Sequence, residues 1–391
     1  MDVKQIYELM NTVTGEILGK SDILAEDLSN VVDIGTEIFN ASAVDNYVKS
    51  LVNHIGKVIF VNRPYTGNVP SLLRDGWEYG SVLEKITADL PDAYENSSWE
   101  LEDKKSYDVN VFYQPKVSAK FFNKKVTFEV PMSFTELQVK QSFSSATQLN
   151  GFLSMLYNAI DRTMTIKMDS LIMRTMNNMI AQTLHAEFPD VTDGNYSAST
   201  GVKAVNLLKL YNDKFTKELT AENCLSDSDF IRFASYTMGV YTNRLSKMST
   251  LFNVGKKERF TSAEYLHIVM LADFMQSANI YLQSNVFHDE FTKFPNAEIV
   301  PYWQGSGTDY SFAKVSDIHV NIDNGSGATA EIVASGILAI MFDRDSMGVC
   351  NLDRRVTTNY NAKAEFYNNY YKFDAGYFND LNENFVVFFV A

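Results

Sequence analysis

The stretch that decides the fold is Leu149–Leu184, LNGFLSMLYNAIDRTMTIKMDSLIMRTMNNMIAQTL. Its apolar residues recur at the three- and four-residue spacing of one helix face, and no proline interrupts them before Pro189. The pattern holds for about 36 residues, or about 54 Å at ~1.5 Å per residue, whereas an average helix has about 11–12 residues. Strict heptads are absent, which excludes a coiled coil. The stretch predicts a single long amphipathic helix, at about 145–187, that lies on a sheet.

The segments after this helix predict a mixture of helices and strands. Apolar spacing predicts helices at about 203–217 and 229–248, and Thr261–Glu264 is a capping-box pattern that predicts a helix running to about 283. Ser133–Glu136 is a second capping-box pattern, placed before the long helix. Strands are predicted at 299–303, 318–322, 336–342 and 384–391. The predicted class is therefore α+β.

The segments before the long helix differ in charge. Residues 1–58 hold nine acidic residues and four lysines, and the spacings of Leu24, Leu28 and Val31 and of Val44, Val48 and Leu51 predict short helices. Residues 59–132 read as a long loop followed by strands at 109–113 and 126–130. Residues 104–125 hold six lysines and one aspartate. We expect these two segments of opposite charge to meet across two copies of the chain.

Composition excludes several classes of protein. The 391 residues carry a net charge of −14, which disfavours binding to nucleic acid through phosphate contacts. Two cysteines, Cys224 and Cys350, are too few for a disulfide framework, and we expect both to be buried, inert thiols. We also expect neither a signal peptide nor a membrane span.

The sequence nominates no catalytic, cofactor or metal site. The Gly305–Gly307 and Gly325–Gly327 stretches lack the remainder of a phosphate-binding loop. Asp343 and Asp345 end an apolar strand, where a metal pair is possible, but charges at an ordinary strand end are the favoured interpretation. His288–Glu290 places three ligand types side by side, and they would point in different directions. No Gly-x-Ser-x-Gly motif is present.

The order of these parts resembles that of a tailed-phage major capsid protein with the Hong Kong 97-type fold. Three stretches carry the resemblance: KFFNKKVTFEVPMSFTELQVKQ (120–141), FHDEFTKFPNAEIVPYWQ (287–304) and MFDRDSMGVCNLDRRVTTNYNAKAEFYNNYYKF (341–373). The resemblance covers most of the chain, from about residue 60 to 391.

The resemblance implies a set of domains and partners. It assigns an N-terminal arm (1–58), an extended loop (59–130), a peripheral domain with the spine helix (131–190), an axial domain (191–355) and a return to the peripheral domain with a terminal strand (356–391). Subunits would assemble in the bacterial host cytoplasm, as hexamers and pentamers, into an icosahedral head that encloses double-stranded DNA without sequence-specific binding. A separate scaffolding protein and a portal are the implied partners. We expect contacts between subunits at Trp77, Lys104, Lys105, Lys120, Lys124, Lys125, Asp22, Glu26 and Asp27.

Two alternatives remain open at this point. One is an encapsulin-like compartment of the same fold, which would carry cargo enzymes in place of DNA. The other, from a different class, is an acidic hydrolase of polysaccharides, in which Trp77, Trp99 and Trp303 would stack on sugars beside paired carboxylates.

Overall fold

The computed structural model of the chain describes residues 3–19, 24–25, 29–40, 46–52, 54, 69–74, 83–88, 102–105, 110, 112–114, 116–191, 194–283, 297–304, 311–323 and 329–391. The chain divides into two compact units. Unit 1 comprises Met1–Glu78, Lys125–Ile172 and Val349–Gly376, and unit 2 comprises Tyr79–Lys124, Met173–Gly348 and Tyr377–Ala391. Each unit is described by itself.

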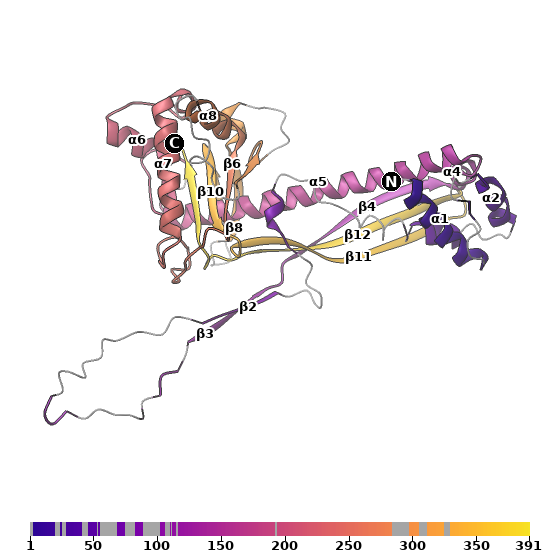
Figure 1. Ribbon diagram of the computed structural model, residues 1–391, viewed down its shortest axis with the longest axis horizontal. Helices are drawn as coiled ribbons and strands as arrows, with labels where there is room; N and C mark the ends of the chain where they lie inside the picture. Colours follow the sequence, from indigo (N-terminus) through magenta and orange to yellow (C-terminus); the bar gives the residue numbers. More distant parts are fainter. Residues whose placement is uncertain are drawn as a thin grey trace. The chain divides into compact units, whose positions relative to one another are not determined.

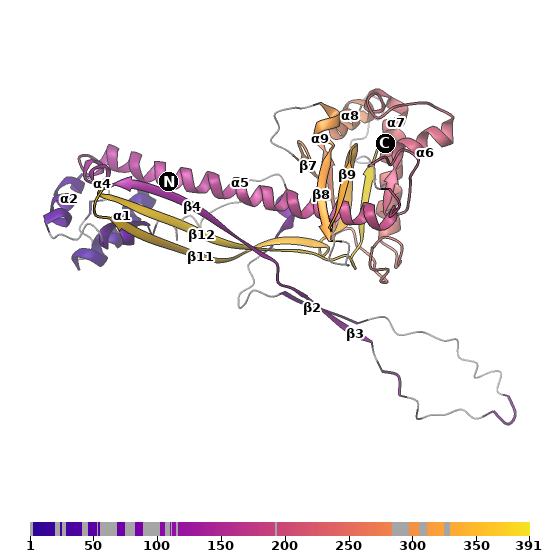
Figure 2. The same ribbon diagram turned by 180° about the vertical axis from the view of Figure 1, so that it is seen from behind.

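Figures 1 and 2 show the elements from two sides. The helices are α1 (Val3–Leu18), α2 (Val31–Asn40), α4 (Glu136–Ser142), α5 (Ala146–Glu187), α6 (Leu207–Phe215), α7 (Ser228–Leu245), α8 (Ala272–Gln283) and α9 (Phe312–Val315), with short 3-10 turns at Pro70–Leu72 and Cys224–Ser226. The strands are β1 (Leu73–Arg74), β2 (Leu83–Ala88), β3 (Val117–Phe122), β4 (Lys125–Thr135), β5 (Ala204–Asn206), β6 (Leu266–Leu271), β7 (Ala297–Val300), β8 (Ile318–Asp323), β9 (Thr329–Ala334), β10 (Ile337–Asp343), β11 (Met347–Asn361), β12 (Phe366–Asn379) and β13 (Phe385–Phe389).

The predicted long helix is confirmed as α5, which has 42 residues. At ~1.5 Å per residue it is about 63 Å long. Leu153, Ile160 and Ile172 on its apolar stripe are fully buried. A helix of this length needs tertiary packing along one face to be stable in water, and the stripe supplies that face in both units.

Unit 1 contains a four-stranded sheet in the order β1-β11-β12-β4. β4 and β12 pair antiparallel over eleven residues, from Lys125 opposite Gly376 to Thr135 opposite Phe366. The N-terminal part of α5 lies on this sheet, where the ring of Phe152 meets that of Phe134 in β4 edge-on, with 5.6 Å between centroids. Residues 366–373 of β12 alternate between half-buried and buried, as expected for a strand with one covered face.

The N-terminal helices of unit 1 pack around Phe143. The ring of Tyr47, from the helical residues 46–52, lies 5.4 Å from that of Phe143 at a tilt of 60°, and the Tyr47 hydroxyl donates a hydrogen bond to the sulfur of Met10 in α1. A side chain at Gly35 of α2 would come within 2.7 Å of the Phe143 ring, so this position requires glycine for close packing. Val48 and Leu51 are helical as predicted, and Val44 lies outside the described residues. The predicted helical start at Leu24 is wrong, because the helix there begins at Val31.

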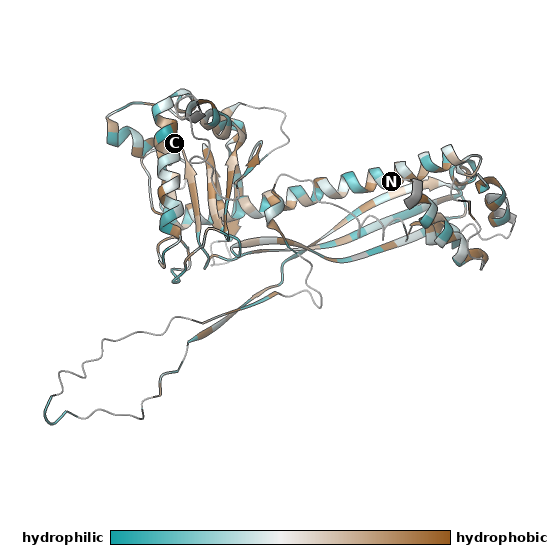
Figure 3. Cartoon of the chain, in the orientation of Figure 1, coloured by the Kyte–Doolittle hydropathy of each residue, from teal (hydrophilic) through white to brown (hydrophobic). Residues whose placement is uncertain are grey.

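Unit 2 is built on a five-stranded sheet in the order β5-β13-β10-β6-β7. β10 pairs antiparallel with both β13 and β6, whereas β5 and β7 add in parallel at the two edges. Figure 3 shows how hydrophobic these strands are, and every residue of β10 and β13 is buried. The terminal strand β13 lies inside this sheet, between β5 and β10.

The two faces of this sheet are covered differently. Helices α6, α7 and α8 pack on the face that includes Met341 and Phe388. On the other face, Phe389 contacts Phe188, which directly follows α5. The β8–β9 pair packs in turn on the end of α5, where Ala181 meets Ile322 and Ile332.

Several sequence predictions need local correction. The capping box before α4 uses Thr135 and Gln138, because Ser133 still belongs to β4 and its hydroxyl bonds to Asn368. The predicted strand at 109–113 is wrong where the chain is described, because 110 and 112–113 have no strand pairing. The predicted helix from 203 begins at Leu207, after the short strand β5.

The largest correction concerns the segment after Thr261. Its capping-box pattern predicted a helix, but Thr261 donates its hydroxyl to Asp343, and residues 266–271 form β6 before α8 begins at Ala272. The run LHIVML is apolar on both sides, so its periodicity could not separate a buried strand from a buried helix. None of the helices in the described parts of the chain is long and apolar enough to cross a bilayer.

Candidate functional site: a ribbon held by buried acids

β2 and β3 form a two-stranded antiparallel ribbon in unit 2, which we call the β2–β3 ribbon. Pairing runs from Leu83 opposite Phe122 to Ala88 opposite Val117, and it places Lys85 directly opposite Lys120. Like charges at opposed positions destabilise a strand pair. The ribbon therefore needs negative charge on the face that carries these two lysines.

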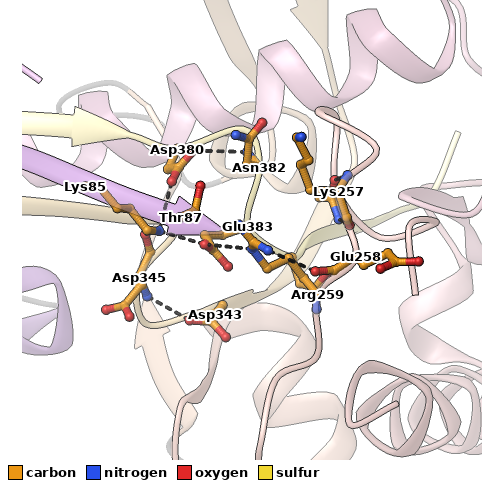
Figure 4. Close-up of polar contacts among 12 residues, drawn as sticks. Lys85, Thr87, Lys257, Glu258, Arg259, Asp343, Asp345, Asp380, Asn382 and Glu383 are labelled. Carbon is orange, nitrogen blue, oxygen red and sulfur yellow. Dashed lines mark hydrogen bonds and ion pairs between the residues drawn. The ribbon is translucent and has the colours of Figure 1, made fainter. Parts of the chain in front are cut away.

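Two acidic residues between β12 and β13 supply this charge (Figure 4). Lys85 Nζ donates to Asp380 Oδ2 at 2.9 Å and to Glu383 Oε1 at 2.7 Å. Lys120 Nζ donates to Asp380 Oδ1 at 2.8 Å, and Arg259 Nε donates to Glu383 Oε1 at 3.1 Å. We call these five residues the root cluster. The Asp380 side chain is 1% exposed and that of Glu383 is 9% exposed, so the acids belong to the body of unit 2 and the ribbon brings the lysines.

The electrostatics of the root cluster favour its charged form. Burial alone would raise the pKa of Asp380, but hydrogen bonds from Lys120 and Lys85 outweigh it and hold the pKa below its ordinary value. Burial would likewise lower the pKa of Lys85, yet the hydrogen bonds and negative charges of Asp380 and Glu383 raise it. Asp380 and Lys85 are therefore ionised at neutral pH, and each stabilises the charge of the other.

Apolar and backbone contacts support the same end of the ribbon. The ring of Phe122 lies 5.3 Å from that of Phe378 in β12. The Tyr377 amide donates to the Lys124 carbonyl, just beyond β3. The face of the ribbon that carries the lysines is thus held by its own subunit through charge, rings and backbone together.

The opposite face of the ribbon carries mostly hydrophobic residues. Because side chains alternate along a strand, this outer face consists of Glu84, Ile86, Ala88, Val117, Ala119 and Phe121. Ile86 is 65% exposed, Phe121 64% and Val117 61%. Within the subunit, the ribbon therefore turns its cations inward and its hydrophobic residues outward.

The residues predicted at subunit contacts fall into three groups. Lys104 and Lys105 are exposed in a turn, where Lys105 pairs with Glu102, and Lys124 and Lys125 are exposed where β4 begins. Lys120 belongs to the root cluster. Trp77, Asp22, Glu26 and Asp27 lie outside the described residues. The structure thus brings one of the predicted lysines into a charged cluster, and its partners there are within the same chain.

Sequence reasoning missed the other members of the root cluster. Lys85 and Asp380 are 295 residues apart, and no local motif links them. A weak signal was present: Asp380 and Glu383 lie between two strongly apolar stretches, and acids there must be exposed or paired.

The chemistries considered from the sequence have structural explanations. Asp343 is buried and accepts hydrogen bonds from Thr261 Oγ1 and the Asp345 amide, while burial raises the pKa of Asp343. Trp303 is fully buried and its indole donates to the Ile337 carbonyl, so it offers no surface to a sugar. The His288 stretch lies outside the described residues, which contain no acid–histidine–cysteine group able to hold a metal ion.

The two cysteines are buried as predicted. Both are free thiols, and burial raises the pKa of Cys224 to about 12 and that of Cys350 to about 11. Neither is therefore ionised near neutral pH, which suits inert core packing.

Comparison with known proteins completes this picture. The family model of the Phi29-like phage major capsid protein matches residues 10–389. The capsid structure of Staphylococcus phage Andhra is similar over 83% of this chain and 84% of its own, with 12% identity and a TM-score of 0.52. A structure described as the head fiber and inner core protein gp22 of native bacteriophage P68 is similar over 84% and 86%, with 10% identity and a TM-score of 0.50. No curated protein matches the chain.

These findings confirm the α+β, Hong Kong 97-type fold that the order of parts predicted. The matched family is structural rather than enzymatic, and its members are components of the virion, which sets aside the hydrolase and the cargo compartment. The family model also covers nearly the whole chain. The chain therefore belongs to the Phi29-like phage major capsid proteins, the subunits from which a tailed phage builds its icosahedral head.

Proposed function

We propose that this capsid subunit assembles as hexamers and pentamers in which the β2–β3 ribbon of one copy lies on a neighbouring copy. Residues 1–58 would serve as the N-terminal arm, 59–130 as the extended loop, 131–190 and 356–376 as the peripheral domain, and 191–355 with the terminal strand β13 as the axial domain. Double-stranded DNA would be enclosed without sequence-specific contacts, in keeping with the net charge of −14. A separate scaffolding protein and a portal would complete the head.

The observation that carries this proposal is the exposed outer face of the ribbon. A two-stranded ribbon is marginally stable by itself in water, and contiguous exposed apolar surface marks an interaction site. Ile86, Val117 and Phe121 are each more than 60% exposed. Since the ribbon's other face already contacts its own subunit, a neighbouring copy is the partner that would cover this one.

The outward side of α5 offers a matching surface for that contact. Met155, Asn158, Arg162 and Ile166 follow one another on its exposed face, and Met155 and Ile166 are 56% and 66% exposed. These two apolar residues are three turns apart, about 16 Å along the helix. Phe121 and Val117 are about 13 Å apart along β3. The two apolar pairs therefore have similar spacing.

Opposite charges favour the same contact between the ribbon and α5 of a neighbour. Glu84 is the acid on the ribbon's outer face, and Arg162 lies between Met155 and Ile166. Neither has an ion-pair partner among the described residues of its own chain. Placing the ribbon on α5 of a neighbour would give each an opposite charge, which fixes register more than it adds affinity.

The lysines outside the root cluster would add long-range attraction. Lys104, Lys105, Lys124 and Lys125 are exposed, and the acidic residues Asp22, Glu26 and Asp27 of a neighbour's arm would be their partners. Exposed pairs of this kind contribute little each and are screened by salt. Their role would be to guide the approach of subunits.

The proposal is tested by electron microscopy and light scattering of the wild-type chain and of Ile86→Ser with Phe121→Ser. We expect shells, tubes or rings from the wild type and dispersed subunits from the double variant. Ile280→Ser on α8 is the matched control, because Ile280 is 64% exposed but lies outside the ribbon and outside α5. Unimpaired assembly of the double variant would contradict the proposed contact.

A charge exchange tests the register. Glu84→Arg and Arg162→Glu should each impair assembly, and the chain that carries both substitutions should recover it. If the combined variant assembles no better than either single one, Glu84 and Arg162 do not meet.

A further inference from the structure

A groove runs between α6 and α7 on the outside of unit 2. Two adjacent hollows of about 420 and 460 Å³ share Lys214, Phe233 and Tyr236 as lining residues. Tyr236 is 66% exposed and Phe215, at the end of α6, is 47% exposed. Exposed aromatic rings gathered in a concave surface are characteristic of the centre of a protein interface.

The cations of this groove are held in place. Lys214 Nζ lies 5.4 Å from the ring centroid of Phe215 and 5.5 Å from that of Phe233, so the ammonium group contacts two rings. The Arg244 guanidinium lies 5.3 Å from the centroid of Tyr241. With Lys217 and Arg232 the lining has four cations against the two acids Asp213 and Asp229. The groove thus combines an aromatic floor with a net positive rim.

Gly239 also indicates that another segment packs against α7. It lies in the middle of α7, one turn from Tyr236 and on the same side of the helix, where glycine is the poorest helix former after proline. A side chain at this position would meet nothing within 4 Å in the subunit. Packing within the chain therefore does not require glycine here. A glycine in this position allows the backbone of another segment to approach the helix closely.

The side of unit 2 away from the groove carries the complementary charge. The outward residues of the β8–β9 pair are His319, Asn321, Asp323, Thr329, Glu331 and Val333. They include two acids and no lysine or arginine. α6 and α7 cover one face of the five-stranded sheet, whereas β8–β9 packs on α5 at the other. Groove and strand pair are thus on opposite sides of one unit.

A closed ring of identical subunits requires two different contact faces on each copy. In a head-to-tail ring each copy presents one face to the copy before it and a different face to the copy after it. We propose that the α6–α7 groove receives the β8–β9 pair of the next copy in the same ring. This inference rests on the proposed assembly into hexamers and pentamers, and it names a second contact that does not involve the β2–β3 ribbon. The occupant is a second copy of this chain, whose strand backbone lies against Gly239 and whose Asp323 and Glu331 face the cations.

The Gly239→Ala variant tests this contact without destabilising the subunit. Alanine is the better helix former, and open space surrounds the position, so the melting temperature of the isolated subunit should rise by about 2–4 °C. Yield of shells or rings, measured by light scattering and electron microscopy, should fall about tenfold. A variant that is more stable and still assembles like the wild type would overturn the proposal.

Charge reversal provides the second test. Arg232→Glu with Arg244→Glu, and separately Asp323→Lys with Glu331→Lys, should each reduce assembly, while the chain carrying all four should recover it. Lys363→Glu, in the exposed turn between β11 and β12, is the matched control for charge and should assemble normally. Failure of the fourfold variant to exceed the double variants, with the melting temperature unchanged, would exclude this pairing of faces. A wild-type chain that forms no oligomer at all would instead count against the proposed function itself.

Discussion

The β2–β3 and β8–β9 pairs of unit 2 are both six-residue antiparallel ribbons, yet they distribute their side chains in opposite ways. In β8–β9 the hydrophobic residues Ile322 and Ile332 are buried against α5, and polar residues face outward. In the β2–β3 ribbon the cations Lys85 and Lys120 face the body, and Ile86 and Phe121 face outward. The difference shows that β8–β9 buries its hydrophobic face within the subunit, whereas the hydrophobic outer face of the β2–β3 ribbon is exposed in the described part of the chain.

The largest loss of stability should come from removing Asp380, the acid that holds the β2–β3 ribbon. Asp380→Ala leaves Lys85 and Lys120 without their shared partner and should lower the free energy of unfolding of unit 2 by about 3 kcal/mol. This is the low end for breaking a buried ion pair, because the two lysine side chains are 22% and 40% exposed and can hydrate. Urea denaturation measures it. The matched change Glu331→Ala, on the outward side of β9, should cost less than about 0.5 kcal/mol; equal losses would remove the distinction between the ribbons.

Isoleucine truncation in each ribbon sharpens the comparison. Ile332→Ala should cost about 2 kcal/mol in the free energy of unfolding, the low end for a buried isoleucine, because its cluster with Ala181 and Ile322 is small. Ile86→Ala should leave subunit stability within about 0.5 kcal/mol and reduce assembly instead. Denaturation and light scattering on the same two variants measure both quantities. A large loss of stability from Ile86→Ala would mean that the outer face is already covered within the subunit.

A pH titration should affect the β2–β3 ribbon and spare β8–β9. The pKa of Asp380 is lowered in the fold, so its contribution is present above its ordinary value of about 4 and is lost as pH falls through the lower, folded value. The pKa of Lys85 is raised, so its contribution is complete below about pH 10.4 and is lost as pH rises through the folded value. A spin label at Ala119→Cys in β3 should gain mobility only below about pH 4 or above about pH 10.4. A spin label at Asn321→Cys in β8 should show no change in mobility at either extreme.

The smallest effect concerns the exposed lysines. Replacing Lys104, Lys105, Lys124 and Lys125 by glutamate should weaken assembly a few-fold at low salt and reduce its dependence on salt concentration. Light scattering between low and high ionic strength measures both. A variant with unchanged assembly and an unchanged salt response would show that these lysines do not guide subunits together.

The long helix was predictable because its signal is local and repeated. α5 keeps hydrophobic residues three and four positions apart over its length, and no other structure explains that spacing. β4 was predictable for the same reason, since Val126, Phe128 and Val130 alternate with polar residues.

The β2–β3 ribbon was not predictable because its partners are distant and its pattern is inverted. In β2 the half-buried positions Leu83, Lys85 and Thr87 alternate with Glu84, Ile86 and Ala88, so neither face reads as hydrophobic. Lys85 lies opposite Lys120 in the ribbon, and the contacts of these two lysines with Asp380 span 295 and 260 residues. Thr261 was misread for a related reason, because its hydroxyl is used by Asp343, 82 residues away, and not by a helix.

The position of β13 in the sheet has a consequence for the order in which a newly made chain can mature. β13 lies between β5 and β10 and is translated after both. Asp380 and Glu383, which hold the ribbon, directly precede β13 and also leave the ribosome late. A nascent chain therefore has neither the complete five-stranded sheet nor a fixed ribbon until residues 380–389 have been synthesised. A chain that ends before Asp380 lacks both the acids that hold the β2–β3 ribbon and the strand that joins β5 to β10.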